Sequence, residues 1–205
     1  MSTYTFADGT VYTSSAQTPE QIQAVAQNVL CQILGIDPEL NPNSAYFAVR
    51  CAWQQEGQPS WQITDDVCVI RAIPENEPYN KVRDESPDDP ANGYFVRNYS
   101  YAQTWTVAMT FVGPNCFDRA RMVAAAMALD YAVQMFEASN LYIKARWDRP
   151  QFVPQIQDGQ WWLRAELTAQ FYEHVSESMT FPAAASVEVT VTTDTGVSES
   201  VTIQA

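Results

Sequence analysis

The sequence predicts an α+β fold, in which a mainly antiparallel sheet of four or five strands carries two helices packed on one face and is followed by a C-terminal β-hairpin. Three observations lead to this prediction. The run from Trp105 to Val112 is rich in β-branched and aromatic residues, as strands are. The run stops at Gly113-Pro114-Asn115, a sequence typical of a tight turn, and a helical pattern follows at once. Residues 186–203 alternate apolar and polar side chains around Gly196, which is typical of a hairpin.

The first helix is predicted over residues 18–34. Thr18 is a suitable N-cap, Pro19 fits the first helical position, and Gln21 completes a capping box with Thr18. Gly35 supplies the stop, because glycine readily adopts the left-handed conformation that ends many helices. The apolar stripe of this helix consists of Ile22, Val25, Ala26, Val29, Leu30, Ile33 and Leu34.

The second helix is predicted over residues 116–136. Its apolar residues recur at spacings of three and four, so they share one face, and the alanines among them permit close approach to a sheet. We expect Asn115 or Cys116 to begin the helix, since Asn is a favoured N-cap and Asp118 is favourable near the positive end of the helix dipole. The turn before it lacks the several glycines and the lysine of a phosphate-binding loop. The stripe consists of Phe117, Ala120, Val123, Ala124, Met127, Ala128, Tyr131 and Met135.

The other strands are predicted from alternation. Ala45–Trp53 and Asp66–Ile73 alternate well enough to form strands, and the Gly- and Pro-containing segment between them favours an antiparallel hairpin. Asn140–Trp147 and Gln160–Tyr172 supply two further strands on either side of a proline-containing connection, residues 148–159. Residues 1–17 are polar and turn-rich, so we expect an arm or an edge strand there.

The segment 74–94 is predicted to be a long acidic loop. Residues 74–93 hold four prolines and six acidic residues and show no periodicity. Long loops in compact domains are commonly functional or become ordered against a neighbour. We therefore divide the chain into an α+β domain, residues 1–182, and a C-terminal hairpin extension, residues 183–205. Because an isolated hairpin is marginally stable in water, we expect this one to pack on the body or on another subunit.

Composition argues against direct gripping of nucleic acid. The 205 residues include 24 acidic and 11 basic ones, which gives a net charge of -13. A nucleic-acid-binding protein neutralises phosphates with clustered Lys and Arg, and this chain shows the opposite balance.

No metal site, cofactor or membrane segment is predicted. Cys31, Cys51, Cys68 and Cys116 lack the close spacing of zinc and redox motifs, and the chain has a single histidine. We expect four buried, reduced thiols, in keeping with a cytoplasmic origin. The N-terminus lacks the basic and apolar regions of a secretory signal, and no run of 18 apolar residues occurs.

A catalytic interpretation would depend on His174. This histidine follows Phe171-Tyr172-Glu173 at a strand end, where it could serve as a general base at neutral pH. No G-x-S-x-G or comparable nucleophile motif accompanies it, so a surface or hydrogen-bonded histidine is favoured. Acidic pairs at 65–66, 84–85 and 88–89 lack the spacing of a calcium-binding loop and are typical of turns and solvated loops. The sequence does not decide whether two carboxylates face each other across a cleft, as a glycosidase requires. We predict no catalytic residue.

Six tryptophans are many for this length. Trp161 and Trp162 are adjacent on a predicted strand and so face opposite ways, which leaves one of them to meet a partner, a covering loop or the chain's own helix. Aromatic residues and Arg are enriched at interface hot spots. The interface candidates are Tyr79, Phe95, Arg97, Trp147, Arg149, Trp161, Trp162 and Arg164.

Residues 106–127, Thr-Val-Ala-Met-Thr-Phe-Val-Gly-Pro-Asn-Cys-Phe-Asp-Arg-Ala-Arg-Met-Val-Ala-Ala-Ala-Met, also carry a family pattern. The stretch resembles the strand-G-x-N-A-x-D-x-A-helix segment of phage neck and tail-terminator proteins, with Cys116 in place of the usual Ala. In that family a later strand carries W-x-x-R and aromatic residues, which Trp161 to Arg164 and Phe171-Tyr172 match. The resemblance covers roughly residues 95–180.

The resemblance implies a structural virion protein of a contractile-tailed phage and not an enzyme. Proteins of this family form a homo-hexameric ring that caps the tail tube and joins it to the head-side connector, with the tail sheath as a further partner. DNA passes through the lumen without sequence-specific binding, and an acidic lining would keep it from sticking. Such a protein is assembled in the host bacterial cytoplasm and resides at the head-tail junction, and residues 1–182 would be its terminator-like domain. A hydrolase that uses His174 and a Trp-rich ligand-binding module are the alternatives.

Overall fold

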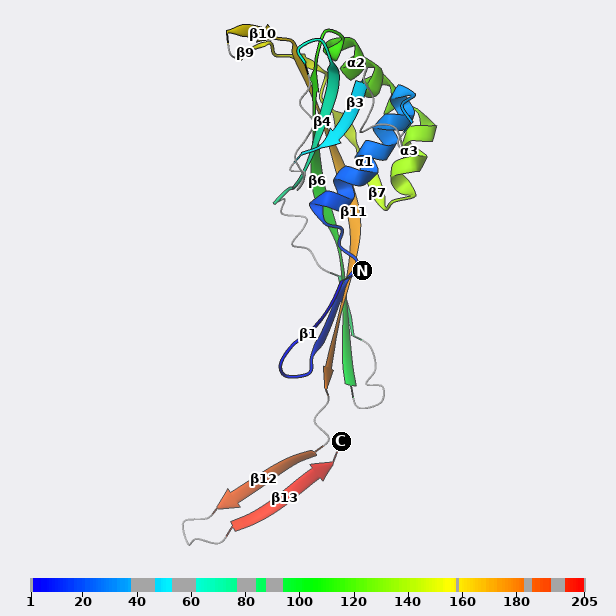
Figure 1. The fold of residues 1–205 in the computed structure, drawn as a ribbon. Coiled ribbons are helices and arrows are strands. Elements are labelled where there is room, and N and C mark those ends of the chain that lie inside the picture. The colour runs from blue at the N-terminus through cyan, green and yellow to red at the C-terminus, as the bar shows by residue number, and fades with distance from the viewer. Residues whose placement is uncertain are drawn as a thin grey trace. The chain divides into compact units, whose positions relative to one another are not determined.

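The computed structural model describes residues 2–37, 47–52, 62–76, 84–87, 94–157, 159–182, 186–192 and 198–204 (Figure 1). Helices and a mainly antiparallel sheet occur together in these residues, which confirms the predicted α+β class. The elements in chain order are β1 (Ser2–Thr5), β2 (Val11–Ser14), α1 (Pro19–Leu34), β3 (Phe47–Cys51), β4 (Asp66–Pro74), β5 (Asp84–Pro87), β6 (Tyr94–Val112), α2 (Cys116–Ala126), α3 (Asp130–Glu137), β7 (Leu141–Trp147), β8 (Gln151–Phe152), β9 (Gln155–Gln157), β10 (Gln160–Trp162), β11 (Arg164–Pro182), β12 (Ser186–Thr192) and β13 (Ser198–Gln204).

The chain divides into two compact units. The core unit comprises residues 17–82 and 101–174, and the strand unit comprises residues 1–16, 83–100 and 175–205. The long strands β6 and β11 each contribute residues to both units.

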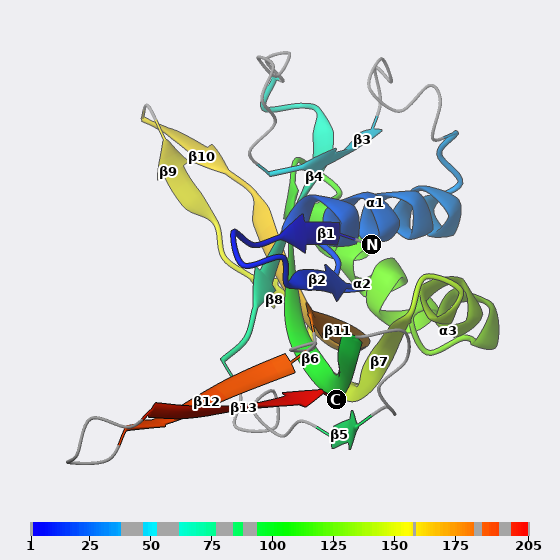
Figure 2. The ribbon, with the colours of Figure 1, turned by 90° about the horizontal axis from the view of Figure 1, so that it is seen from below.

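In the core unit, the sheet runs in the order β11-β6-β4-β3, and β7 and β8 also pair with β11. Alternate residues of the three central strands are buried, and the helices α1, α2 and α3 lie on that side of the sheet (Figures 1 and 2). The prediction that helices cover one face is therefore confirmed. The buried face consists of Cys68, Ile70 and Ala72 from β4, Trp105, Val107, Met109 and Phe111 from β6, and Ala165, Leu167, Ala169 and Phe171 from β11.

Helix α1 forms as its capping signals predict. The Thr18 hydroxyl accepts a hydrogen bond from Gln21 N at 3.3 Å, and the Gln21 side chain accepts one from Thr18 N at 2.9 Å. Gly35 ends the helix with a φ of 67°. Both signals are local, so the sequence reveals them without knowledge of the tertiary structure.

The single helix predicted over residues 116–136 is wrong, because the chain breaks between α2 and α3 at Met127–Leu129. Leu129 is extended, with φ -88° and ψ 140°. The break changes the buried face after Met127, so that Ala132 and Phe136 are buried while Tyr131 of the predicted stripe is exposed. Phe117, also in the predicted stripe, is exposed at the start of α2, where Cys116 is buried instead. A continuous helix could not bury both sets on one sheet.

The antiparallel hairpin predicted from Ala45–Trp53 and Asp66–Ile73 is also wrong. β3 and β4 are parallel, with Phe47 opposite Asp66 and Cys51 opposite Ile70. Residues 52–65 between them provide the long connection that a parallel pair requires. Ala48 to Arg50 and Asp66 to Cys68 are buried without alternation, as is usual in parallel pairs.

Three further predictions are refined by the structure. Asp84–Pro87, inside the loop predicted at 74–94, forms β5 and pairs with residues 97–100 of β6. The connection predicted at 148–159 holds β8 and β9, and the strand predicted at 160–172 is interrupted at Leu163. The C-terminal hairpin is confirmed, since β12 and β13 pair antiparallel from Ser186↔Gln204 to Thr192↔Ser198.

The strand unit contains no helix in its described residues. Within the stretch predicted as an arm or edge strand, residues 1–17, Ser2–Thr5 and Val11–Ser14 form the antiparallel hairpin β1–β2, and β2 pairs with residues 177–180 of β11. The pair β12–β13 forms a two-stranded sheet of its own.

Candidate interaction surfaces

The turn between β6 and α2 is held by contacts that leave no room for a side chain. Gly113 has a φ of 118°, and a Cβ there would lie 2.5 Å from Asp65 O and 2.5 Å from Asp66 Oδ1. Asn115 is the N-cap residue as predicted, but its side chain does not cap the helix. Its backbone N and Nδ2 instead donate to Asp66 Oδ1 and Oδ2 at 2.9 and 2.8 Å. The turn thereby fixes α2 to the first residue of β4.

A buried carboxylate fixes the start of α1 to the sheet. Glu173 lies on the buried side of β11, where its Oε2 accepts a hydrogen bond from Trp105 Nε1 and its Oε1 one from Gln17 N, both at 2.8 Å. Burial raises the pKa of the Glu173 carboxyl, while these hydrogen bonds act in the opposite direction. Sequence analysis missed this residue. Its only signal is its place in the alternating buried positions that run from Ala165 to Val175.

The strand unit has no hydrophobic layer among its described residues. Every member of the apolar core cluster belongs to the core unit. Within residues 2–16, 94–100 and 175–182, the buried side chains are only Thr10, Ser14, Val175 and Glu177. Large apolar side chains are instead exposed, namely Tyr4 (60%), Phe6, Tyr94 and Phe95. A stable sheet buries at least one face against another layer, and the described residues of this unit do not supply such a layer.

One face of the strand unit is aromatic and nearly uncharged. Tyr4 and Tyr12 are opposite each other and stack with ring centroids 6.2 Å apart, and Met179 follows on the far side of Tyr12. The Tyr12 hydroxyl donates to Glu177 at 2.7 Å. Apart from Glu177 and Arg97, residues 2–5, 11–14, 94–100 and 175–182 are uncharged in a chain of net charge -13. Loss of charge together with exposed aromatic residues is typical of interface cores.

A second apolar surface lies in the core unit at the hairpin β9–β10, which extends away from the side that carries the helices (Figures 1 and 2). Ile156 and Trp161 are directly opposite each other in this hairpin, and Trp161 is 63% exposed. Phe152 contacts Phe117 of α2 edge-to-face, with centroids 6.0 Å apart. We call these exposed side chains the hairpin patch, and its members are Phe117, Phe152, Val153, Ile156, Trp161 and Leu163.

The predicted interface residues do not form one cluster. In the core unit, Trp161 and Arg149 are exposed, Trp162 is half-buried, and Trp147 ends β7 opposite Ala169. Phe95 and Arg97 are exposed and belong to the strand unit, while Tyr79 lies outside the described residues. Arg164 forms an ion pair with Glu166 and donates to Gln155 Oε1 at 3.1 Å, so it braces the base of the β9–β10 hairpin. Their role in an interface stays a prediction.

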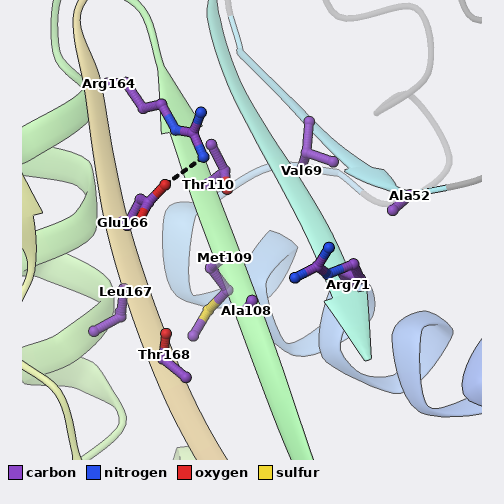
Figure 3. Close-up of a pocket in the computed structure, with 10 residues that line it drawn as sticks. All are labelled: Ala52, Val69, Arg71, Ala108, Met109, Thr110, Arg164, Glu166, Leu167 and Thr168. Carbon is purple, nitrogen blue, oxygen red and sulfur yellow. Dashed lines mark hydrogen bonds and ion pairs between the residues drawn. The ribbon is translucent and has the colours of Figure 1, made fainter. Parts of the chain in front are cut away.

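The face of the core-unit sheet opposite the helices carries an open pocket of about 440 Å³ (Figure 3). Ala108 and Thr110 of β6 line the bottom of the pocket, with Arg71 on one side and the Arg164–Glu166 ion pair on the other. None of its ten lining residues is a tryptophan, cysteine or histidine. His174 is exposed elsewhere, and its imidazole makes no hydrogen bond within the described part of the chain.

The four cysteines are free thiols; Cys31, Cys68 and Cys116 are buried and Cys51 is half-buried. Burial raises the pKa of Cys31 to about 11, which keeps it protonated at neutral pH. Among the described residues no cluster of His, Cys, Asp or Glu is suited to a metal ion, and no helix is long and apolar enough to cross a membrane.

Within the described residues, the core unit is packed around an apolar cluster and the strand unit contributes no residue to it, which is a feature of proteins that assemble with other subunits. A family model described as phage neck terminator protein matches residues 20–200, so the chain belongs to that family of structural virion proteins of the phage tail and neck. A search of curated proteins found no match. The family match confirms the resemblance seen in residues 106–127 and 161–172.

Proposed function

We propose that this chain is the ring-forming neck subunit of a contractile-tailed phage, in which six copies cap the tail tube and join it to the head-side connector. The sheath is a further partner, and the phage DNA passes through the lumen without sequence-specific contacts. The protein is assembled in the host bacterial cytoplasm and resides at the head-tail junction of the virion. Membership of the neck terminator family supports the neck role.

The observation that carries the ring is the strand unit without a core. A chain that folds one unit around a full apolar core, and has a second sheet whose described residues form no such core, gains stability when neighbours cover that sheet. The strand unit and the hairpin patch are different surfaces, so a contact between the strand unit of one copy and the hairpin patch of the next is heterologous. Repeated heterologous contacts close into a ring when the rotation between copies allows it.

The acidic segment 74–94 and the C-terminal hairpin, residues 187–203, are proposed as further contacts with neighbouring subunits, tube or sheath. The net charge of -13 also suits a lumen, since like-charged walls repel DNA phosphates and let the duplex slide. On this proposal residues 1–182 act as the terminator domain, and the hairpin serves the assembled ring.

Tails assembled without this protein test the proposal. Negative-stain images are expected to show tails of uncontrolled length or tails that fail to join heads, and restoring the protein is expected to correct both. Tails of normal length that carry heads in its absence would refute the neck role. Light scattering coupled to size exclusion then measures whether purified copies form a ring of six.

The two alternative functions gain no support from the described side chains. A hydrolase needs its base beside a nucleophile in a concave site, and His174 is exposed and lies outside the pocket. A Trp-rich binding module needs tryptophans along one groove, yet Trp105 is buried in the core while Trp161 projects from the β9–β10 hairpin.

A further inference from the structure

Three parts of the strand unit lack a further strand partner within the described residues: β1, β5 and the hairpin β12–β13. β5 contains Asp84, Glu85 and Pro87, residue types that block edge pairing, so β1 and the hairpin are the two candidates. β1 is hydrogen-bonded to β2 on one side, and no described strand pairs with its other side. The hairpin β12–β13 likewise pairs only with itself, and a two-stranded hairpin alone is marginally stable in water.

The register shows which backbone groups of β1 face the open side. Phe6 N donates to Thr10 O at 2.8 Å, and from that pair the register continues as Thr5↔Val11, Tyr4↔Tyr12 and Thr3↔Thr13. Hydrogen-bonded and non-hydrogen-bonded pairs alternate in an antiparallel ladder. The N–H and C=O groups of Thr3 and Thr5 therefore point away from β2, toward the open edge.

This edge suits strand addition. β1 reads Ser-Thr-Tyr-Thr and contains no charged residue and no proline, two devices with which proteins block edge pairing. The strands of the hairpin, residues 186–192 and 198–204, are also free of proline and of basic residues. A strand laid beside β1 thus meets no like charge there.

We propose that the open edge of β1 accepts the C-terminal hairpin β12–β13 of a second copy of this chain, which extends the sheet of the strand unit. The inference rests on the proposed ring and names one of its contacts. The edge and the hairpin are different parts of the chain, so each copy can donate one hairpin and accept another, and the contact can repeat around a ring.

The length of the connection argues that the hairpin comes from a neighbour. A strand added to β1 would lie three strand spacings from β11, about 14 Å, since neighbouring strands are about 4.8 Å apart. Pro182 and Ser186 are separated by four Cα steps, which span at most about 13–14 Å when fully extended. The connection would also have to pass the turn Phe6–Thr10, next to which β11 ends, so a chain's own hairpin cannot comfortably reach its own β1.

Two variants separate the part that donates the hairpin from the β1 edge that accepts it. The double substitution Thr3→Pro and Thr5→Pro removes the outward N–H groups of β1 and leaves its ladder with β2 intact. A chain ending at Pro182 keeps the edge but lacks the hairpin. The control Thr3→Ala and Thr5→Ala keeps every backbone N–H group. Circular dichroism and urea unfolding check that each variant is folded.

Each variant alone is expected to lose self-association at least tenfold in native mass spectrometry and sedimentation, while the alanine control matches the original chain. Mixed together, the proline variant and the shortened chain are expected to form a one-to-one heterodimer, because one supplies the hairpin and the other the edge. Unchanged self-association of either variant, a mixture without heterodimers, or an original chain that stays monomeric would each overturn the proposal. The tail-length experiment is independent, so a ring that controls tails without hairpin exchange leaves the proposed function standing.

Discussion

At the residue scale, Gly113 is required by its surroundings. Its φ of 118° is one that other residues rarely adopt. A Cβ at this position would also lie 2.5 Å from Asp65 O, a backbone atom that cannot move aside as a flexible side chain could. Gly113→Ala is expected to destabilise the protein by at least about 2 kcal/mol in urea unfolding, because strain and clash add. Gly35→Ala is the matched control, since Gly35 also has positive φ but no atom within 4 Å, and it is expected to cost about 1 kcal/mol. Equal losses would contradict the role of the close contact.

Glu173 gives a pH-dependent prediction. Because burial raises its pKa in the folded state, its contribution to stability is full below the unfolded pKa and is lost as pH rises through the folded pKa. Trp105→Phe removes one hydrogen bond that opposes this shift, so the folded pKa rises further and more stability is lost at neutral pH. We expect a cost of about 1–3 kcal/mol at pH 7 and a smaller one at pH 4, measured by urea unfolding at both.

The control for Trp105 is Phe136→Leu, which changes a buried aromatic that packs on Phe171 at 4.7 Å. Its destabilisation is expected to be the same at both pH values. If the cost of Trp105→Phe were equally independent of pH, the carboxylate would not be responsible.

At the element scale, local signals were predictable and long-range ones were not. Thr18, Gln21 and Gly35 define α1 because the caps involve neighbours in the chain. The break before Leu129 contains neither Gly nor Pro, and it is decided by which residues fit against the sheet. The 52–65 connection between β3 and β4 is long enough for a loose hairpin or for a parallel pair, so its length alone did not decide the parallel orientation.

The cap of α1 can be tested in the same way. Thr18→Ala removes the acceptor for Gln21 N and is expected to cost about 0.5–2 kcal/mol of unfolding free energy. Thr18→Ser keeps the hydroxyl and is expected to stay close to the original chain. Thr18 is exposed, so lost packing would not account for a difference between the two variants.

At the scale of the whole molecule, composition indicated an assembly protein, and the structure showed that the chain divides into a core unit and a strand unit. The net charge of -13 and the six tryptophans favoured an assembly protein over one that binds DNA through a basic surface. Apolar and polar residues alternate along β6 and β11 both where helices cover the strands and beyond. The sequence therefore could not show that residues 94–100 and 175–182 contribute nothing to the apolar core cluster. Of the candidate interface residues, Trp161 was the most accessible to reasoning, because two adjacent tryptophans on a strand cannot share one core.

The hairpin patch makes the last prediction. Trp161 is exposed opposite Ile156, so Trp161→Ala is expected to leave the unfolding free energy of the monomer within about 0.5 kcal/mol. A buried tryptophan at an interface commonly contributes about 2 kcal/mol or more, so the same change is expected to weaken assembly or tail capping at least tenfold. Tyr131→Ala, an exposed aromatic on α3 outside the patch, is the control and is expected to have little effect on either measurement. Equal effects of the two variants on sedimentation would show that exposure alone, and not the place of Trp161 on the β9–β10 hairpin, governs association.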